Sequence, residues 1–181
     1  MGKSQKNAAG SGSHIIKLKP VGIVRSLSKD TGWGSTSGKP IWRERAAKMK
    51  EQQEAASEII IDDALEGVLD GIEEFSHIIV LYWAHFAPAE KRSTTRVHPM
   101  GNKGFPLVGV FATRGPVRPN SILATVARLV ERKGNILRVT GLDALDGSPV
   151  LDIKPYYPER RLKGVRVPDW MREINDKFND I

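Results

Sequence analysis

The sequence predicts a mainly β protein: a compact, closed or nearly closed antiparallel β-barrel with a few short helices. Three observations favour this fold class. Short apolar, β-branched runs outnumber helical patterns, short turns join several of them, and no helix regularly follows a strand as a doubly wound sheet requires. The 181 residues are enough for one domain with a substantial core.

The N-terminal part holds one clear strand pattern and two less regular segments. Residues 14–24 (HIIKLKPVGIV) are rich in β-branched side chains and predict the first strand. Residues 28–40 are rich in glycine and serine, which is typical of a mobile loop that can serve as a lid. Residues 43–57 contain good helix formers but little apolar face, so they are either an exposed helix or an ordered crossing segment.

The middle of the chain contains the most apolar run. Residues 58–61 predict a short strand, and Asp62 and Asp63 offer an N-cap for one or two helical turns at residues 64–69. Residues 77–83 (HIIVLYW) are continuously apolar. That pattern indicates a strand that is buried on both faces or lies in a barrel wall.

The later segments share a short, turn-bounded pattern. They comprise a Gly-rich loop at 99–106, strands at 107–113, 121–130, 136–141 and 150–153, and a turn at 133–135 that makes the second and third of these strands a hairpin. Residues 167–178 predict a helix with Pro168 at its start and Asp169 in its first turn.

Three regions follow from these patterns. Residues 1–14 are interpreted as a flexible tail or a cloning remnant, residues 15–157 as the barrel domain, and residues 158–181 as a C-terminal arm and helix. The formal net charge is +7, and Lys3 and Lys6 in the tail leave about +5 for the rest. A basic body favours polyanionic partners such as nucleic acid, although a merely soluble basic surface has the same charge.

The composition excludes several classes of protein. Without cysteine there is no disulfide scaffold, no Cys-ligated zinc site and no thiol nucleophile. No two histidines are three or four positions apart, so no metal site is predicted. No apolar run reaches the ~18 residues of a membrane-spanning helix, and the tail lacks a signal-peptide core, so a soluble cytoplasmic protein without a membrane partner is expected. Phosphate-binding P-loop, Rossmann and nucleophile-elbow motifs are also missing.

Two loops contain residues suited to binding. In residues 109–120 (GVFATRGPVRPN), Arg114 and Arg118 lie four positions apart in a turn that follows a strand, where they can hold a carboxylate or phosphate or can simply be solvated. In residues 141–149 (GLDALDGSP), Asp143 and Asp146 flank a turn. Two carboxylates there suit ribose hydroxyls, an ammonium group or a metal ion, although aspartates also commonly cap turns.

Two further segments place polar groups beside expected strands. Asp152 in residues 151–157 (LDIKPYY) needs a partner, which either Arg114 or Lys154 can supply. His85 directly follows the apolar strand, where functional side chains often emerge, although a lone histidine in such a place is more often structural. His77, at the start of that strand, is expected to be structural.

Read in order, four blocks resemble the TsaA-like (YaeB-like) family. Its pattern contains VGxVRS, FSHxxxLxxxH, GVFATRxPxRPNPI and LDxxDGTPxxDIKPY. The chain carries the matching blocks at residues 21–26, 69–85, 109–122 and 142–156, so the resemblance spans residues 16–157.

This resemblance implies a β-barrel methyltransferase that is unrelated to the Rossmann-type enzymes. Characterised members use S-adenosylmethionine to methylate N6 of a threonylcarbamoyl-adenosine beside the tRNA anticodon. They are expected to be homodimers with the site near the subunit interface. The partners implied for this chain are therefore tRNA and a second copy of itself, and the reaction needs no metal.

The resemblance also implies site residues. Cofactor contacts fall on His85, Phe86, Arg114, Asp143, Ala144, Leu145 and Asp146. Catalytic roles fall on His85, the nearest candidate for a general base, and on Arg118, which can hold the threonylcarbamoyl carboxylate. Substrate or RNA contacts fall on Arg118, Asn120, Lys154 and Tyr156, with the basic stretch 154–166 and Tyr157 assisting.

The chain departs from the family pattern at a few positions. The early Pro-Arg-Gln motif matches residues 40–43, where only Pro40 is kept, Ser121 replaces Pro, Leu123 replaces Gly, and Ser148 stands for Thr. Two rival functions therefore stay open. One is a protein of this fold that methylates another RNA or a small molecule, and the other is a non-catalytic binding module.

Overall fold

Six strands close into an antiparallel barrel in the order β1-β2-β7-β6-β3-β8, which confirms the predicted fold class. The computed structural model describes residues 15–26, 55–157 and 164–179. The barrel strands are β1 (Gly22–Arg25), β2 (Ala56–Ile61), β3 (His77–Trp83), β6 (Ile122–Lys133), β7 (Ile136–Thr140) and β8 (Pro149–Pro155). Closure leaves no unpaired sheet edge among them.

The barrel is filled by every second side chain of its strands. In β3, Ile78, Val80 and Tyr82 are buried, whereas the residues between them are only partly covered. Ile59 of β2 and Leu137 of β7 are fully buried beside them. Because side chains alternate across a strand, this period of two assigns one set of residues to the interior.

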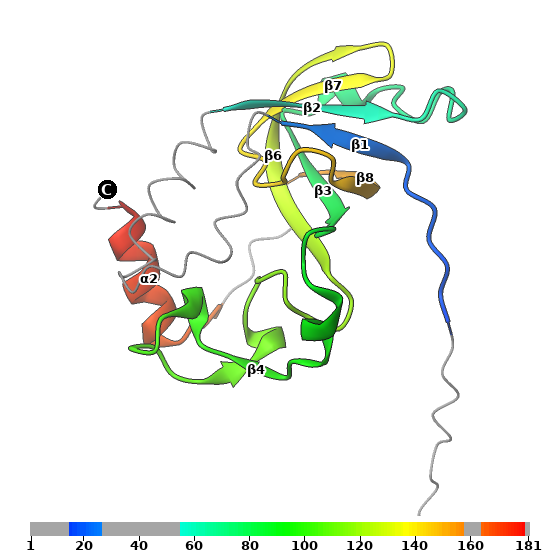
Figure 1. The fold of residues 1–181 in the computed structure, drawn as a ribbon. Coiled ribbons are helices and arrows are strands. Elements are labelled where there is room, and N and C mark those ends of the chain that lie inside the picture. Colours follow the sequence, from blue (N-terminus) through cyan, green and yellow to red (C-terminus); the bar gives the residue numbers. More distant parts are fainter. Residues whose placement is uncertain (1–14, 27–54, 158–163, 180–181) are drawn as a thin grey trace, which may run out of the picture.

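The chain between β3 and β6 forms a lobe below one end of the barrel (Figure 1). It contains short 3₁₀ turns and a two-stranded ladder, namely η2 (Ala89–Ser93), β4 (Arg96–Val97), η3 (Pro99–Gly101), β5 (Val108–Gly109) and η4 (Val110–Ala112). The helix α2 (Asp169–Asn179) lies beside this lobe, close to the predicted range 167–178. The remaining 3₁₀ turn, η1 (Ile72–Glu74), precedes β3.

The first strand is shorter than the predicted range 14–24. Its ladder with β2 begins at Gly22, opposite Ile61, the last residue of β2. Val21 still bonds to Val150 and Asp62, but no strand of the described chain pairs with the residues before it, and Ile15 and Ile16 are exposed. A β-branched composition alone therefore does not extend a strand beyond its partner.

The predicted helical turns at 64–69 are wrong, because this segment forms a series of turns. Asp62 still accepts a hydrogen bond from the Ala64 backbone N–H at 3.0 Å, as a cap would. Gly67 and Gly71 then adopt left-handed backbone angles, with φ of 80° and 82°, which a right-handed helix excludes. Only η1 is helical in this region.

The predicted strand at 107–113 is also wrong beyond its first residues. Pairing stops at Gly109, because the Val110 N–H donates to the Thr95 carbonyl at 3.0 Å and the chain turns into η4. The Thr113 hydroxyl then donates back to the Val110 carbonyl at 2.9 Å. These local hydrogen bonds take the place of the interstrand hydrogen bonds that a longer strand would make.

The other strand predictions are confirmed with changed ends. The expected strands at 58–61, 121–130 and 150–153 are longer in the structure, and a bulge between Leu129 and Glu131 lets β6 continue to Lys133. The tail 1–14, the loop 28–40, the segment 40–43 and most of 43–57 lie outside the described residues.

Candidate active site

The predicted cofactor residues lie at one end of the barrel. In an antiparallel barrel, the end of β3, the start of β6, the end of β7 and the start of β8 all point the same way. His85 and Phe86 follow β3, and the loop at 141–148, called here the acidic loop, joins β7 to β8. The topology thus brings two distant parts of the sequence to the same rim.

A buried tyrosine fixes the first carboxylate of the acidic loop. Tyr82 lies in the barrel interior with 2% of its surface exposed, and its hydroxyl donates to Asp143 Oδ1 at 2.6 Å. The Thr125 hydroxyl of β6 donates to the same oxygen. Burial and the neighbouring Asp143 charge raise the pKa of Tyr82, so the phenol stays protonated and remains a donor. Asp143 itself is exposed, so it can also meet a ligand.

The second carboxylate ties the acidic loop to β1. Asp146 Oδ1 accepts a hydrogen bond from the Ser26 backbone N–H at 3.0 Å. Next to it, the Gly147 N–H donates to the Val24 carbonyl at 2.8 Å, and the Val24 N–H donates to the Ser148 carbonyl at 2.9 Å. Gly147 has φ of 78°, a conformation that favours glycine. The loop is therefore held at both of its aspartates.

His85 contacts the acidic loop through Ser148. His85 Nδ1 lies 3.4 Å from the buried Ser148 hydroxyl, and a Cβ added at Gly147 would lie 3.6 Å from His85 Nε2. Partial burial lowers the pKa of His85, while a hydrogen bond to the Trp83 backbone and the Asp146 charge oppose that shift. The imidazole is therefore mainly neutral at pH 7 and can accept a proton.

Phe86 extends the same rim with an exposed ring. Its centroid lies 4.0 Å from that of His85, and 57% of the residue's surface is exposed. A ring placed next to an imidazole can stack on a planar group. Of the other two predicted residues of the acidic loop, Ala144 is buried in the core, so only its backbone can face a ligand. Leu145 is half-buried, and its carbonyl accepts the Ser148 N–H at 3.0 Å.

The arginine loop, residues 113–121, enters β6 at the same end. The Ala84 N–H donates to the Ser121 carbonyl at 2.8 Å, which joins the start of the His85 segment to the end of this loop. Arg114 is exposed, and so is Asn120. Arg118 is half-buried, and its Nη1 donates to the carbonyls of Thr113 and Gly115 at 3.4 and 3.5 Å. Arg118 therefore helps to hold the loop in shape.

Lys154 and Tyr156 lie at the other end of the barrel. Lys154 pairs with Ile79 near the start of β3, and the Tyr156 N–H donates to the His77 carbonyl at 3.0 Å. The seven residues of β3 separate this end from His85 by about 20 Å. The structure does not bring these two predicted RNA residues to the rim of His85.

Asp152 has its partner on its own strand. Its carboxylate lies 2.6 Å from the Lys154 ammonium, and its side chain is 46% exposed. Of the two partners that the sequence allowed, Lys154 is the one used. Arg114 is therefore not held by this ion pair.

Sequence reasoning missed the residues that hold the acidic loop. Tyr82 shares the inward face with Ile78 and Val80, so the period of two in HIIVLYW could have placed its hydroxyl inside the barrel. A buried phenol hydroxyl needs a hydrogen-bond partner, so the pattern could also have predicted a polar side chain close to Tyr82. Nothing in the sequence points to Thr125 or to the Ser26 backbone.

The donor set at this rim fits S-adenosylmethionine. Carboxylates suit the ribose hydroxyls and the amino group of such a molecule, an aromatic ring suits its adenine, and an exposed guanidinium suits its carboxylate. Asp143, Phe86 and Arg114 offer these three groups. Within the described residues, no three His, Asp or Glu side chains converge as metal ligands. None of the helices described there is long and apolar enough to cross a membrane.

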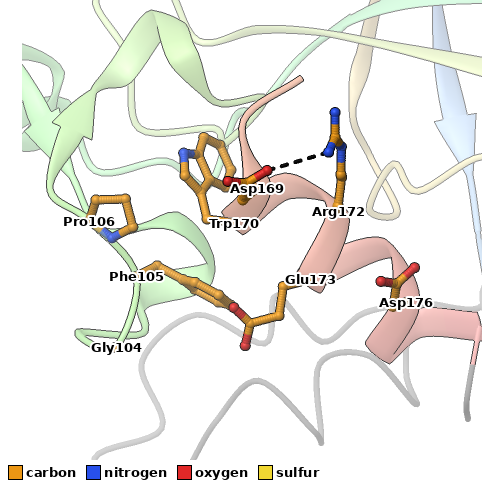
Figure 2. A pocket seen from close by; sticks show the side chains of 8 residues that line it. All are labelled: Gly104, Phe105, Pro106, Asp169, Trp170, Arg172, Glu173 and Asp176. Carbon is orange, nitrogen blue, oxygen red and sulfur yellow. Dashed lines mark hydrogen bonds and ion pairs between the residues drawn. The ribbon is translucent and has the colours of Figure 1, made fainter. Parts of the chain in front are cut away.

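A separate open groove of about 550 Å³ lies between α2 and the lobe. Figure 2 shows its lining, which consists of Gly104, Phe105, Pro106, Asp169, Trp170, Arg172, Glu173 and Asp176. No residue of the acidic or arginine loop lines it. Its α2 rim carries three carboxylates and one arginine, and that arginine lies 3.4 Å from Asp169. An acidic rim of this kind disfavours a phosphate-bearing ligand.

The closed antiparallel barrel agrees with a TsaA-like protein, the class that the motif order predicts. The family profile described as tRNA-methyltransferase O N-terminal domain matches residues 42–160. The chain belongs to this family.

The chain is similar to several curated proteins. It is 44% identical over 144 residues to a probable S-adenosyl-L-methionine-binding protein of Methanothermobacter thermautotrophicus, covering 80% of this chain and 92% of that protein. A tRNA (adenine(37)-N6)-methyltransferase of Mus musculus is 43% identical over 91 residues, covering 50% of this chain but only 21% of the mouse protein.

Solved structures agree with the fold. A crystal structure of TrmO superposes with a TM-score of 0.60 at 29% identity, covering 84% of this chain and 61% of that one. TrmO from Pseudomonas aeruginosa gives a TM-score of 0.60 at 27% identity, with the same two coverages. The chain thus spans less than two thirds of the length of these solved proteins.

Proposed function

We propose that the protein is an S-adenosylmethionine-dependent methyltransferase that modifies N6 of an adenosine in tRNA. The observation that carries this proposal is the position of His85 beside an acidic loop fixed by Tyr82 and Ser26. Family membership supports the proposal. So do the names of its relatives, which are S-adenosyl-L-methionine-binding proteins and a tRNA (adenine(37)-N6)-methyltransferase.

The finer substrate is a threonylcarbamoyl-adenosine next to the anticodon. Its carboxylate needs a cation, and the arginine loop supplies Arg118 at the rim that carries His85. Asn120, exposed in the same loop, is the proposed polar contact to the RNA. Lys154 and Tyr156 at the opposite end are proposed to meet a more distant part of the tRNA.

Each residue has a defined task in this proposal. S-adenosylmethionine, when bound, supplies a methyl group on a sulfonium sulfur that leaves as a neutral thioether. Asp143, Asp146, Phe86 and Arg114 bind and orient this donor. His85 Nε2, the ring nitrogen not engaged by Ser148, takes the proton that N6 loses as its new bond to carbon forms. Positioning of the two reactants supplies much of the rate.

Two associated proposals concern assembly and location. A homodimer is proposed to form through the outer face of β3 and β6, where Ile79 pairs with Val126 and Leu81 with Ala124. Val126 is 47% exposed there, and an apolar strip of this kind favours burial against a second copy. The cytoplasm is the proposed location, because tRNA is modified and used there.

The decisive experiment combines binding with transfer. Calorimetry should show that the purified protein binds S-adenosylmethionine, and labelled methyl should appear in total tRNA. Mass analysis of tRNA nucleosides from cells lacking the protein should then show the missing N6-methyl group. Absence of cofactor binding at millimolar concentration would contradict the proposal.

A second function is favoured by the relatives that are named only as binding proteins. The chain would then bind S-adenosylmethionine without transferring its methyl group. Cofactor binding without methyl transfer to any RNA or small molecule tested would favour this binding module over the enzyme.

A further inference from the structure

An aromatic side chain projects from the lobe without cover. Phe111 is 77% exposed, although the preceding residue of η4, Val110, is only 5% exposed. A ring this exposed offers a flat apolar face on which a planar ligand group can stack. The proposed reaction assigns no task to this ring.

The backbone that carries Phe111 is fixed on both sides. The Val110 N–H donates to the Thr95 carbonyl at 3.0 Å, and the Val110 carbonyl accepts both the backbone N–H and the hydroxyl of Thr113. The ring is therefore presented from an ordered turn. A group presented in this way loses little backbone freedom when it binds a ligand.

A cation lies over the same ring. The Arg118 guanidinium carbon is 5.7 Å from the Phe111 centroid, and its Nη1 is bound to two carbonyls of the arginine loop. A planar ring beside a fixed cation is the combination that binds single-stranded nucleic acid, in which a base stacks on the ring and the cation attracts phosphate.

A second arginine–aromatic pair lies at the same end of the barrel. The Arg92 guanidinium carbon is 5.0 Å from the centroid of Trp83, the last residue of β3. Arg92 Nε is buried and has no hydrogen-bond partner among the described residues. Trp83 pairs with Ile122, and the Ala84 N–H bonds to the Ser121 carbonyl, so both pairs belong to segments that meet beside His85.

We propose that Phe111 is a stacking platform for one base of a single-stranded RNA segment, namely a nucleotide adjacent to the target adenosine. The cations of Arg118 and Arg92 attract the negatively charged RNA strand at this end of the barrel. This inference rests on the proposed function and adds how the RNA strand is held. Bases in RNA loops are unstacked and accessible, so an exposed ring can select a loop over a duplex.

The occupant is a base rather than a second copy of the chain. The proposed dimer face on β3 and β6 is apolar, whereas Phe111 is accompanied by Arg118 and followed closely by Arg114. Cations surrounding an exposed ring fit a polyanion better than a surface of the same positive charge.

The test uses the full chain and a fluorescent anticodon stem-loop RNA at fixed salt. Phe111→Ala and Phe111→Leu should weaken binding about 5-fold to 100-fold, the loss of one base–aromatic stack, while Phe111→Trp should stay within about 2-fold. Val68→Ala, which changes another exposed apolar side chain (59% exposed) at the other end of the barrel, is the control and should bind as the original does.

Three outcomes would overturn the inference. If Phe111→Leu binds the RNA as tightly as the original chain, the ring is not a stacking platform and the proposed methyl transfer still stands. Loss of S-adenosylmethionine binding or of dimer formation in Phe111→Ala assigns the ring to the cofactor site or to the interface. If the original chain binds no tRNA and methylates none, the proposed function fails, and this inference fails with it.

Discussion

At the scale of single residues, three side chains determine the chemistry of the rim, namely the carboxylates of Asp143 and Asp146 and the phenol of Tyr82. Tyr82, buried among apolar neighbours, is the inner anchor of Asp143, and Asp146 is the charge that faces His85. Removing the Tyr82 hydroxyl should therefore affect Asp143, and removing the Asp146 charge should change the pKa of His85. A side chain that only packs in the core would have neither effect.

The pH dependence of methyl transfer should report the state of His85. Burial lowers the pKa of His85 below its usual value of 6.5, so the neutral base persists as pH falls and activity should decline only below about pH 6.5. Asp146 opposes that shift, so Asp146→Asn should move the acid limb of kcat/KM to still lower pH. An unmoved limb in this variant, or an unchanged limb in His85→Gln, would exclude His85 as the base.

Tyr82→Phe should weaken cofactor binding while leaving the barrel folded. It removes one of the two hydroxyls that hold Asp143, a hydrogen bond to a charged group, so we expect a loss of about 1–2 kcal/mol, or about fivefold to thirtyfold in Kd. Calorimetry measures this change. Tyr157→Phe, an exposed tyrosine outside the rim, should bind normally, and equal affinities in both variants would remove Tyr82 from the site.

Arg114→Lys should fold normally and lose most methyl transfer, and Arg114→Ala should lose more, about tenfold to a hundredfold in kcat/KM. Lysine keeps the charge but lacks the planar fork that holds a carboxylate. Because Asp152 pairs with Lys154, neither change should lower Tm. A sharp fall in Tm with unchanged cofactor affinity would show that the role of Arg114 is structural instead.

At the scale of elements, the pairing of β1 with β2 sets a strict packing limit at Gly22. Gly22 faces the Ile60 carbonyl, and a Cβ on Gly22 would overlap that oxygen. Gly22→Ala should therefore reduce the free energy of unfolding by about 2–3 kcal/mol, as overpacking against backbone does. Urea denaturation measures this loss.

Gly134→Ala is the matched control for that change. Gly134 has φ of 59° in the β6–β7 turn and nothing within 4 Å of an added Cβ, so only backbone strain of about 1 kcal/mol is expected. An equal loss in both variants would show that the crowding at Ile60 is not the cause.

The sequence predicts the elements that obey a single periodic rule. β3, β6 and β7 are confirmed because alternation or a continuous apolar run marks strands that have partners on both sides. The segments at 64–69 and 107–113 differ because left-handed glycines and a Val110–Thr95 bond determine them, and neither leaves a periodic signal.

The same distinction explains how far the candidate site could be predicted. His85, Asp143 and Asp146 lie beside turn residues in recognisable sequence blocks, so the sequence alone could identify them as candidate site residues. The bonds from Thr125 and the Ser26 backbone depend on how distant strands pack, and a sequence pattern does not contain that information.

At the scale of the whole molecule, charge should govern the affinity for tRNA. A body of about +5 that contacts phosphates releases counterions, so binding should weaken steeply as salt rises. Lys154→Ala, at the end remote from His85, should lower the salt slope by about 1 if the RNA extends over the barrel wall. An affinity that is constant between low and physiological salt would contradict tRNA binding.

The seam where β1 meets β8 links the stability of the barrel to its ligand. Gly22 and Ile23 pair with β8 across this seam, and the Val21 N–H bonds to the Val150 carbonyl at one end of it. At the other end, the bonds of Val24 to Gly147 and Ser148 belong to the segment that carries Asp146. Opening the seam at that end breaks the hydrogen bonds that hold the loop, so a molecule that binds the folded loop is expected to stabilise the closed barrel by mass action.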